Sequence, residues 1–132
     1  MAKKQSSTKQ SSTKHRRLCT TLVNNLSPDL LTREWRDKAT STLSGHCYVA
    51  SEAAWHVLGG MSSPWRPYVA RCGDITHWWL QNGDKILDLT AAQFPCGFDY
   101  ASGRKCGFLT KEPSRRARIL LARSGFAIAS ST

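Results

Sequence analysis

Between residues 44 and 60, apolar side chains recur at the three-to-four-residue spacing that places them on one face of a helix. Ser44 is a residue type that commonly caps a helix N-terminus, and the Gly59-Gly60 pair is typical of a helix end. The pattern therefore predicts a helix with Cys47 in its first turn. Its apolar stripe consists of Val49, Ala50, Ala53, Ala54, Val57 and Leu58.

Two further segments carry helix signals. Ser27-Pro28-Asp29 combines a cap, a proline at the first helical position and an acidic residue in the first turn, which predicts a helix over residues 26–36. Residues 113–123 form an amphipathic basic pattern that Gly125 ends. The side chains expected in the core from the first of these helices are Leu30, Leu31, Trp35 and Ala39.

A pattern rich in β-branched and aromatic residues follows the cysteine helix. Residues 66–72 carry apolar and β-favouring side chains after Pro67 and suit an edge strand, and residues 75–80 and 85–89 flank an Asn82-Gly83 hairpin signal. We expect three strands in an antiparallel meander, with Trp78 and Trp79 in the core. Residues 90–110 have little periodicity and predict a helical turn at 91–94, an aromatic-rich loop and a short strand near Phe108.

Positive charge is distributed unevenly along the chain. The chain has 132 residues, the length of one domain, and a formal charge of +10. Residues 1–17 hold six of the nineteen Lys and Arg residues, no acidic residue and almost no apolar residue. We therefore predict a disordered basic tail over 1–17, a single catalytic-type domain over 18–125 and a frayed C-terminus over 126–132.

The five cysteines are expected to be reduced. They contain no CxxC pair, no secretory signal precedes them, and no apolar run reaches the ~18 residues of a membrane span. These features predict a cytoplasmic protein without membrane contact. A zinc site is disfavoured because the cysteines lack the short spacing of structural zinc ligands, so no metal or cofactor is expected. The cysteines that could join Cys47 in such a site are Cys72, Cys96 and Cys106.

Cys47 is the candidate nucleophile. The unpaired N–H groups and the positive dipole at a helix N-terminus stabilise a thiolate. A cysteine nucleophile also needs a base and a group that orients it. A two-residue Asn82-Gly83 loop would place His77 directly opposite Asp88, with Cβ atoms ~4.5–5.5 Å apart on one face of the sheet.

Each of these residues also has a structural interpretation. Cys47 suits a small core position, His77 a structural strand position, and Asp88 a cap for the turn at residues 90–92. His46 is a second candidate imidazole, although its side chain points about 100° away from Cys47 around the helix. His56 suits a half-buried helix position, and His15 falls in the predicted tail.

Three short motifs together resemble a known core. Gly45-His46-Cys47, then Thr76-His77-Trp78-Trp79, then Ile86-Leu87-Asp88-Leu89-Thr90 resemble the Cys-His-Asp core of papain-like and transglutaminase-like cysteine hydrolases. The pattern is also similar to that of small uncharacterised phage and bacterial proteins, which would place the chain in a host cytoplasm. The resemblance implies an α+β fold in which N-terminal helices pack on a small antiparallel sheet, with the basic helix at the C-terminus.

The resemblance also implies roles for the three residues. Cys47 would be the nucleophile, His77 the base and later the acid, and Asp88 the group that orients His77. Attack on an amide or peptide-type carbonyl of a protein or small amide substrate would form a thioester. The backbone N–H of Cys47 would help to hold the oxyanion, and the motifs identify no second donor.

The sequence is also compatible with two other functions. The first is a basic binding protein that contacts nucleic acid or an acidic partner through the tail and the C-terminal helix. The second is an inactive hydrolase fold used as an interaction module. The helix residues considered for nucleic-acid contact are Arg115, Arg116 and Arg118.

Overall fold

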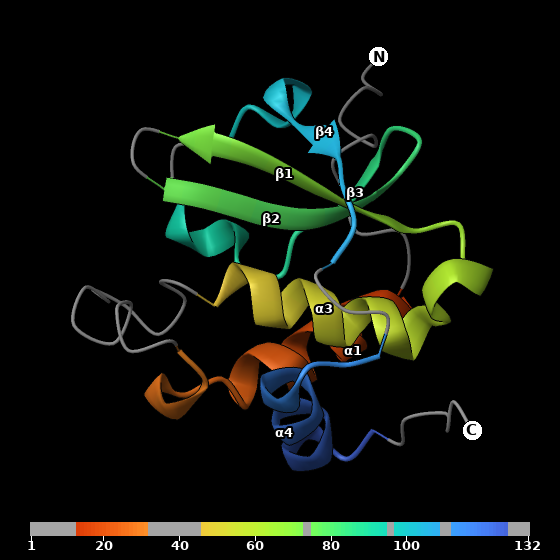
Figure 1. The fold of residues 1–132 in the computed structure, drawn as a ribbon, viewed down its shortest axis with the longest axis vertical. Coiled ribbons are helices and arrows are strands. Elements are labelled where there is room, and N and C mark those ends of the chain that lie inside the picture. The colour runs from red at the N-terminus through yellow and green to blue at the C-terminus, as the bar shows by residue number, and fades with distance from the viewer. Residues whose placement is uncertain (1–12, 32–45, 73–74, 95–96, 109–111, 127–132) are drawn as a thin grey trace.

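The fold is α+β, as expected, and the described part of the chain has three α-helices on one side of a four-stranded antiparallel sheet (Figure 1). The computed structural model describes residues 13–31, 46–72, 75–94, 97–108 and 112–126. Leucines and alanines from the three helices form one apolar core with Leu80 and Leu87 of the sheet. The helices are α1 (Thr13–Asn24), α3 (Cys47–Leu58) and α4 (Arg115–Ser124).

Helix α3 begins at Cys47, so the cysteine is its first helical residue. The N-cap position belongs to His46 and not to Ser44, which lies outside the described residues. The predicted C-terminal end is confirmed, because Gly59 adopts the left-handed conformation with a φ of 119°. Burial of the predicted apolar stripe is confirmed from Val49 to Ala54, while the last two positions are half-buried.

Helix α1 was not predicted and corrects the expected tail. It includes residues 13–17, which the charge pattern had assigned to a disordered segment, whereas residues 1–12 lie outside the described part. Leu18 and Leu22 are four residues apart and both buried, and Leu26 continues the row after the helix ends. This apolar row packs α1 against the core. The basic residues of the first turn therefore belong to a packed helix.

The segment after α1 begins with a short 3₁₀ turn, η2 (Pro28–Leu30). Pro28 is its first residue, as predicted for a helix, and Leu30 and Leu31 are buried as expected. The remainder of the predicted helix, with Trp35 and Ala39, lies outside the described residues.

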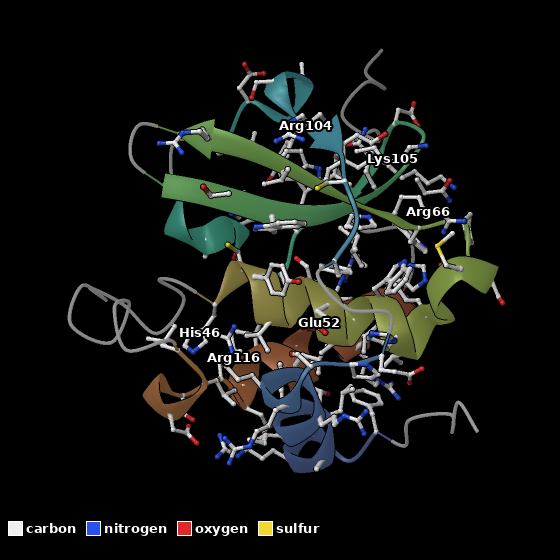
Figure 2. All side chains as sticks on the ribbon, in the orientation of Figure 1. His46, Glu52, Arg66, Arg104, Lys105 and Arg116 are labelled. Atoms are coloured by element: carbon white, nitrogen blue, oxygen red, sulfur yellow. The ribbon has the colours of Figure 1, made fainter. Side chains whose placement is uncertain are left out.

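Helix α4 is confirmed and is joined to α3 through a buried carboxylate (Figure 2). Glu52 of α3 accepts hydrogen bonds from the backbone N–H of Ser114 at 2.7 Å and from its hydroxyl at 2.8 Å. Ser114 in turn caps the helix by accepting from the N–H of Ala117. Phe126 packs against the core, so the expected fraying does not begin there, and residues 127–132 lie outside the described part.

The sheet has the order β3-β2-β1-β4, and its first three strands form the predicted meander. The prediction that residues 66–72 form an edge strand is wrong, because β4 pairs with Tyr68 and Val69 on the outer side of β1. Phe108, where a strand was expected, has no strand assignment. The strands are β1 (Arg66–Cys72), β2 (Ile75–Asn82), β3 (Lys85–Leu87) and β4 (Arg104–Lys105).

The hairpin register differs from the predicted one by two residues. Asn82 pairs with Lys85, so the loop is Gly83-Asp84 and not Asn82-Gly83, and Gln81 lies opposite Ile86. Gly83 has a φ of +64°, whereas no described non-glycine residue has a positive φ. A glycine with positive φ at the first loop position is typical of a type II′ hairpin, and this explains the displaced loop.

The two faces of the sheet have different environments. Leu80 and Leu87 face the helices, whereas Trp79 and Ile86 belong to a second apolar cluster with Ala70. Short 3₁₀ turns lie after β3, at η4 (Ala91–Gln93), and before β4, at η5 (Tyr100–Ser102); η4 confirms the predicted helical turn. The half-buried residues that pack on the second cluster are Tyr68, Phe98 and Tyr100.

Candidate active site

His77 and Asp88 form a buried hydrogen-bonded pair, with His77 Nε2 and Asp88 Oδ2 2.7 Å apart. The two residues are 0% and 6% exposed. They are not directly opposite one another, because the register of Leu80 with Leu87 places Asp88 level with Trp79. Diagonal neighbours on one face of an antiparallel pair remain within reach of a long side chain. The predicted contact therefore forms through a different register from the predicted one.

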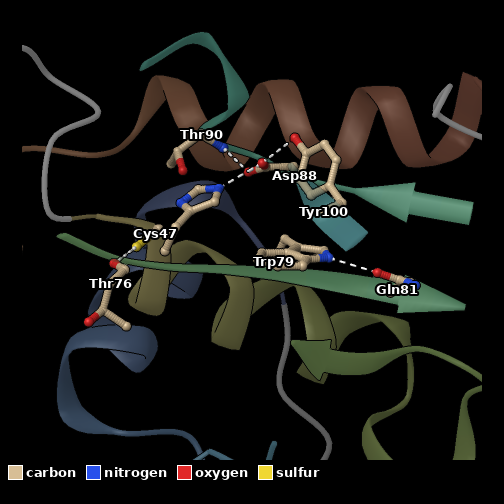
Figure 3. A network of polar contacts seen from close by, with 8 residues as sticks. Cys47, Thr76, Trp79, Gln81, Asp88, Thr90 and Tyr100 are labelled. Atoms are coloured by element: carbon tan, nitrogen blue, oxygen red, sulfur yellow. Dashed lines mark hydrogen bonds and ion pairs between the residues drawn. The ribbon is translucent and has the colours of Figure 1, made fainter. Parts of the chain in front are cut away.

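Asp88 receives two further hydrogen bonds (Figure 3). The hydroxyl of Tyr100 donates to Oδ2 at 2.6 Å, and the backbone N–H of Thr90 donates to Oδ1 at 3.2 Å. The structural interpretation of Asp88 as a cap for the following turn is thus also realised. Three donors satisfy a carboxylate that is almost withdrawn from water.

Tyr100 is the functional candidate that the sequence did not reveal. It lies in a loop without apolar periodicity, and its contact with Asp88 joins residues twelve positions apart across the aromatic cluster. Both burial and the negative charge of Asp88 raise the pKa of the Tyr100 hydroxyl, so it remains a neutral donor. Only the three-dimensional placement of η5 over the sheet shows its role.

Cys47 lies where the α3 N-terminus meets the first residues of β2. Its thiol donates to the backbone carbonyl of Thr76 at 3.6 Å, and Thr76 immediately precedes His77 (Figure 3). Strand β3 pairs only with residues 80–82 of β2, so this end of β2 extends beyond β3. The cysteine is 7% exposed. Being the first helical residue, it also has an N–H without an acceptor inside the helix.

The pKa of His77 reflects both of its neighbours. Burial alone lowers this pKa, but the hydrogen bond and the charge of Asp88, together with the nearby Cys47, outweigh burial and raise it from 6.5 to about 9. Nε2 is held by Asp88, whereas Nδ1 is buried and has no hydrogen-bond partner among the described residues. Because Asp88 holds Nε2, Nδ1 is the nitrogen that remains available to Cys47.

Aromatic rings enclose the imidazole. Trp79 stacks on His77 with ring centres 5.7 Å apart, and Phe94 and Phe98 approach to 4.7 and 4.8 Å. The indole N–H of Trp79 is held by Gln81 Oε1 at 2.9 Å. These contacts fix the plane of the His77 ring and separate it from bulk water. The prediction that Trp79 lies in the core is confirmed, and Trp78 is half-buried.

The remaining histidines have other positions. His46 is buried and its Nε2 lies 2.9 Å from the carbonyl of Ser27, which joins the start of α3 to the segment before η2. His56 is half-buried, as expected, and burial lowers its pKa. His15 does not lie in a tail, since it belongs to α1 and contacts Trp65 edge-on.

Two other cysteines have described side chains, Cys19 and Cys106. Cys19 is half-buried on α1, and burial together with the charge of Asp88 raises its pKa to about 12. Cys106 is a free, half-buried thiol. No group of three His, Cys, Asp or Glu side chains suited to a metal ion occurs among the described residues, which leave out Cys96 and the side chain of Cys72.

The basic C-terminal helix uses part of its charge internally. Arg116 donates to the carbonyl of Leu30 at 3.0 Å, and Arg118 donates through Nε to the carbonyl of Pro113 at 2.9 Å. Arg115 is exposed.

No helix in the described part of the chain is long and apolar enough to cross a membrane.

Comparison of the chain with protein-family models, with curated proteins and with solved structures gives no match. The function proposed below therefore rests on the chemistry of Cys47, His77 and Asp88 themselves.

Proposed function

We propose that the protein is a cysteine-dependent hydrolase or acyltransferase that acts on an amide or peptide-type bond. Cys47 is the nucleophile, His77 is the general base and acid, and Asp88 orients the imidazole. The observation that carries the proposal is that the two nitrogens of the His77 ring have different environments. Nε2 bonds to Asp88 at 2.7 Å, while the buried Nδ1 has no partner in the described structure and adjoins Cys47.

The resting state follows from the pKa of His77. At neutral pH a group with a pKa of about 9 is protonated, so His77 carries a positive charge. Before attack the Cys47 thiol gives up the proton that it donates to the Thr76 carbonyl, and the adjacent imidazolium and the helix N-terminus stabilise the thiolate that attacks the carbonyl carbon. Asp88 stabilises the imidazolium and prevents rotation of the ring.

The first half-reaction forms a thioester. The Cys47 thiolate attacks the carbonyl carbon, and the electron pair of the C=O bond moves to oxygen. The N–H of Cys47 is one donor for this oxyanion. As the tetrahedral intermediate collapses, His77 transfers its proton to the leaving nitrogen, the C–N bond breaks and the amine departs.

The second half-reaction reverses the role of His77. The neutral imidazole accepts a proton from water or from an acceptor amine as that molecule attacks the thioester. The C–S bond breaks, and the products are a carboxylic acid or a new amide. Cys47 leaves as the thiolate beside the reprotonated His77.

Trapping of the thioester tests this function. The protein is incubated with an activated acyl ester at pH 7, and the intact mass and the labelled peptide are determined. We expect a single acyl group on Cys47 that hydroxylamine removes. We also expect Cys47→Ala to abolish the label and Cys19→Ala to leave it unchanged. Labelling distributed over several cysteines, or a Cys47→Ala protein labelled to the same extent, would contradict the proposal.

A further inference from the structure

A cavity of about 940 Å³ lies at the opposite end of α3 from Cys47. Its walls come from α1, the C-terminal end of α3, residues 63–65, the β2–β3 hairpin and the end of α4 with Phe126. Figure 1 shows the hairpin and the C-terminal end of α3 on the same side of the molecule. The volume is within the range of roughly 300–1,000 Å³ that small-molecule sites occupy.

The lining combines an apolar floor with positive charge. Trp65 and Leu18 are buried, and they lie with Val57, Leu58 and Phe126 around the cavity. Arg17 and Lys85 are exposed and contribute two cationic groups, and His15 lies against Trp65. No aspartate or glutamate is among the described residues that line the cavity. A concave site with cations and without acids attracts an anion.

One of the lining residues carries an unsatisfied polar group. Ser124 lies at the cavity, and its hydroxyl oxygen is buried without a hydrogen-bond partner among the described residues. A buried polar group without a partner costs free energy unless a ligand or water supplies one.

One wall of the cavity is preformed. The guanidinium of Arg66 donates to the carbonyls of Ser63 and Trp65 at 2.7 Å and to that of Met61 at 3.1 Å. It thereby holds the loop that carries Trp65 (Figure 2). The indole N–H of Trp55 bonds to the Trp65 carbonyl from the other side at 3.0 Å. A wall fixed before binding lowers the entropic cost of association.

From these features we propose that the cavity binds a small aromatic acid, a flat apolar body that carries a carboxylate or a phosphate. The apolar body packs on Trp65, Leu58 and Phe126. The anionic group faces Arg17 and Lys85. Residues 47 and 58 are the two ends of α3, so the cavity lies roughly 16 Å along the helix from the nucleophile, at 1.5 Å per residue. The site is therefore separate from the proposed catalytic centre.

Titration of the full-length protein with matched probes, followed by NMR, tests the proposal. The probes are 2-naphthoate, 2-naphthyl phosphate, the neutral 2-naphthylmethanol and the cationic 2-naphthylmethylammonium. We expect saturable binding of an anion that is at least about tenfold tighter than binding of the alcohol. The indole N–H resonance of Trp55 should shift on binding. Whichever of the two anions binds more tightly identifies whether the natural ligand carries a carboxylate or a phosphate.

Two exposed lysines provide a matched pair of variants. Lys85→Glu reverses a charge at the cavity and should weaken anion binding by about tenfold or more. Lys105→Glu makes the same change on β4, outside the cavity, and should leave binding unchanged. Cys47→Ala should also bind normally, which separates this site from the proposed catalysis. Equal affinity for the alcohol and the anions, absence of saturable binding, or an unchanged affinity in Lys85→Glu would overturn the proposal.

Discussion

Tyr100 and His77 bind the same oxygen of Asp88, Tyr100 at 2.6 Å and His77 at 2.7 Å. One carboxylate oxygen therefore accepts hydrogen bonds from both the neutral phenol of Tyr100 and the ring of His77. The phenol and the imidazole thus compete for the lone pairs of one carboxylate oxygen, and Asp88 in turn raises the pKa of His77.

Replacement of Tyr100 by phenylalanine should change the pKa of His77 through Asp88, to which both residues bind. With one donor fewer, Asp88 attracts the imidazole proton more strongly, so we expect the pKa of His77 to rise above its value of about 9. NMR titration of the His77 ring measures this shift.

Tyr68→Phe is the matched control for that experiment. Tyr68 belongs to the same aromatic cluster and stacks on Trp79, but its hydroxyl makes no hydrogen bond to Asp88. We expect an unchanged His77 pKa in this variant. Equal shifts in the two variants would mean that the Tyr100 hydroxyl has no specific effect on Asp88.

The raised pKa of His77 also predicts a pH dependence of stability. The folded protein binds a proton at His77 more tightly than the unfolded chain does, so this contribution to the free energy of unfolding is complete below pH 6.5. It is lost as the pH rises from 6.5 through about 9. The shift corresponds to roughly 3 kcal/mol.

Urea unfolding at a series of pH values between 6 and 10 measures that loss. Asp88→Asn removes the negative charge and should flatten the decrease in this interval. If the wild type and Asp88→Asn lose the same free energy of unfolding over the interval, the decrease has a source other than the His77–Asp88 pair.

Gly103 is required by the close approach of Trp79. A Cβ atom at position 103 would lie 2.3 Å from Cη2 of this fully buried ring, whereas one at Gly107 would have nothing within 4 Å. Gly103→Ala should therefore displace the indole that stacks on His77 and destabilise the fold by roughly 1–3 kcal/mol. Gly107→Ala should change thermal stability little. Near-ultraviolet circular dichroism and the melting temperature report both effects, and equal melting temperatures would contradict the predicted clash.

The elements that position the site were largely predictable because their signals are local. Apolar spacing and the glycine pair indicated α3, and β-branched and aromatic residues indicated β2. The position of the hairpin loop was wrong by one residue, yet a two-residue change of register is even and leaves every side chain on its original face. His77 and Asp88 therefore remained neighbours.

Other features depend on contacts between distant parts of the chain. Helix α1 begins in a basic segment that resembles a tail until the core covers Leu18 and Leu22. Strand β4 has only two residues, too few for a pattern, and its pairing is what moves β1 from the edge of the sheet. The contact of Tyr100 with Asp88 likewise arises from the folding of an aperiodic loop.

The His77–Asp88 pair is proposed to activate Cys47, and the pH dependence of Cys47 alkylation measures this activation most directly. Iodoacetamide labelling of each cysteine is followed by peptide mass spectrometry from pH 5 to 9. Cys106, a half-buried thiol outside the site, and Cys19, whose pKa is about 12, are internal references.

We predict that Cys47 reacts at pH 6 to 7 roughly a hundredfold faster than Cys19, and faster than Cys106. We also predict that Asp88→Asn and His77→Gln slow Cys47 to the rate and pH dependence of an ordinary thiol. A Cys47 that reacts no faster than Cys19, or whose pH profile is the same in wild type and His77→Gln, would contradict the account.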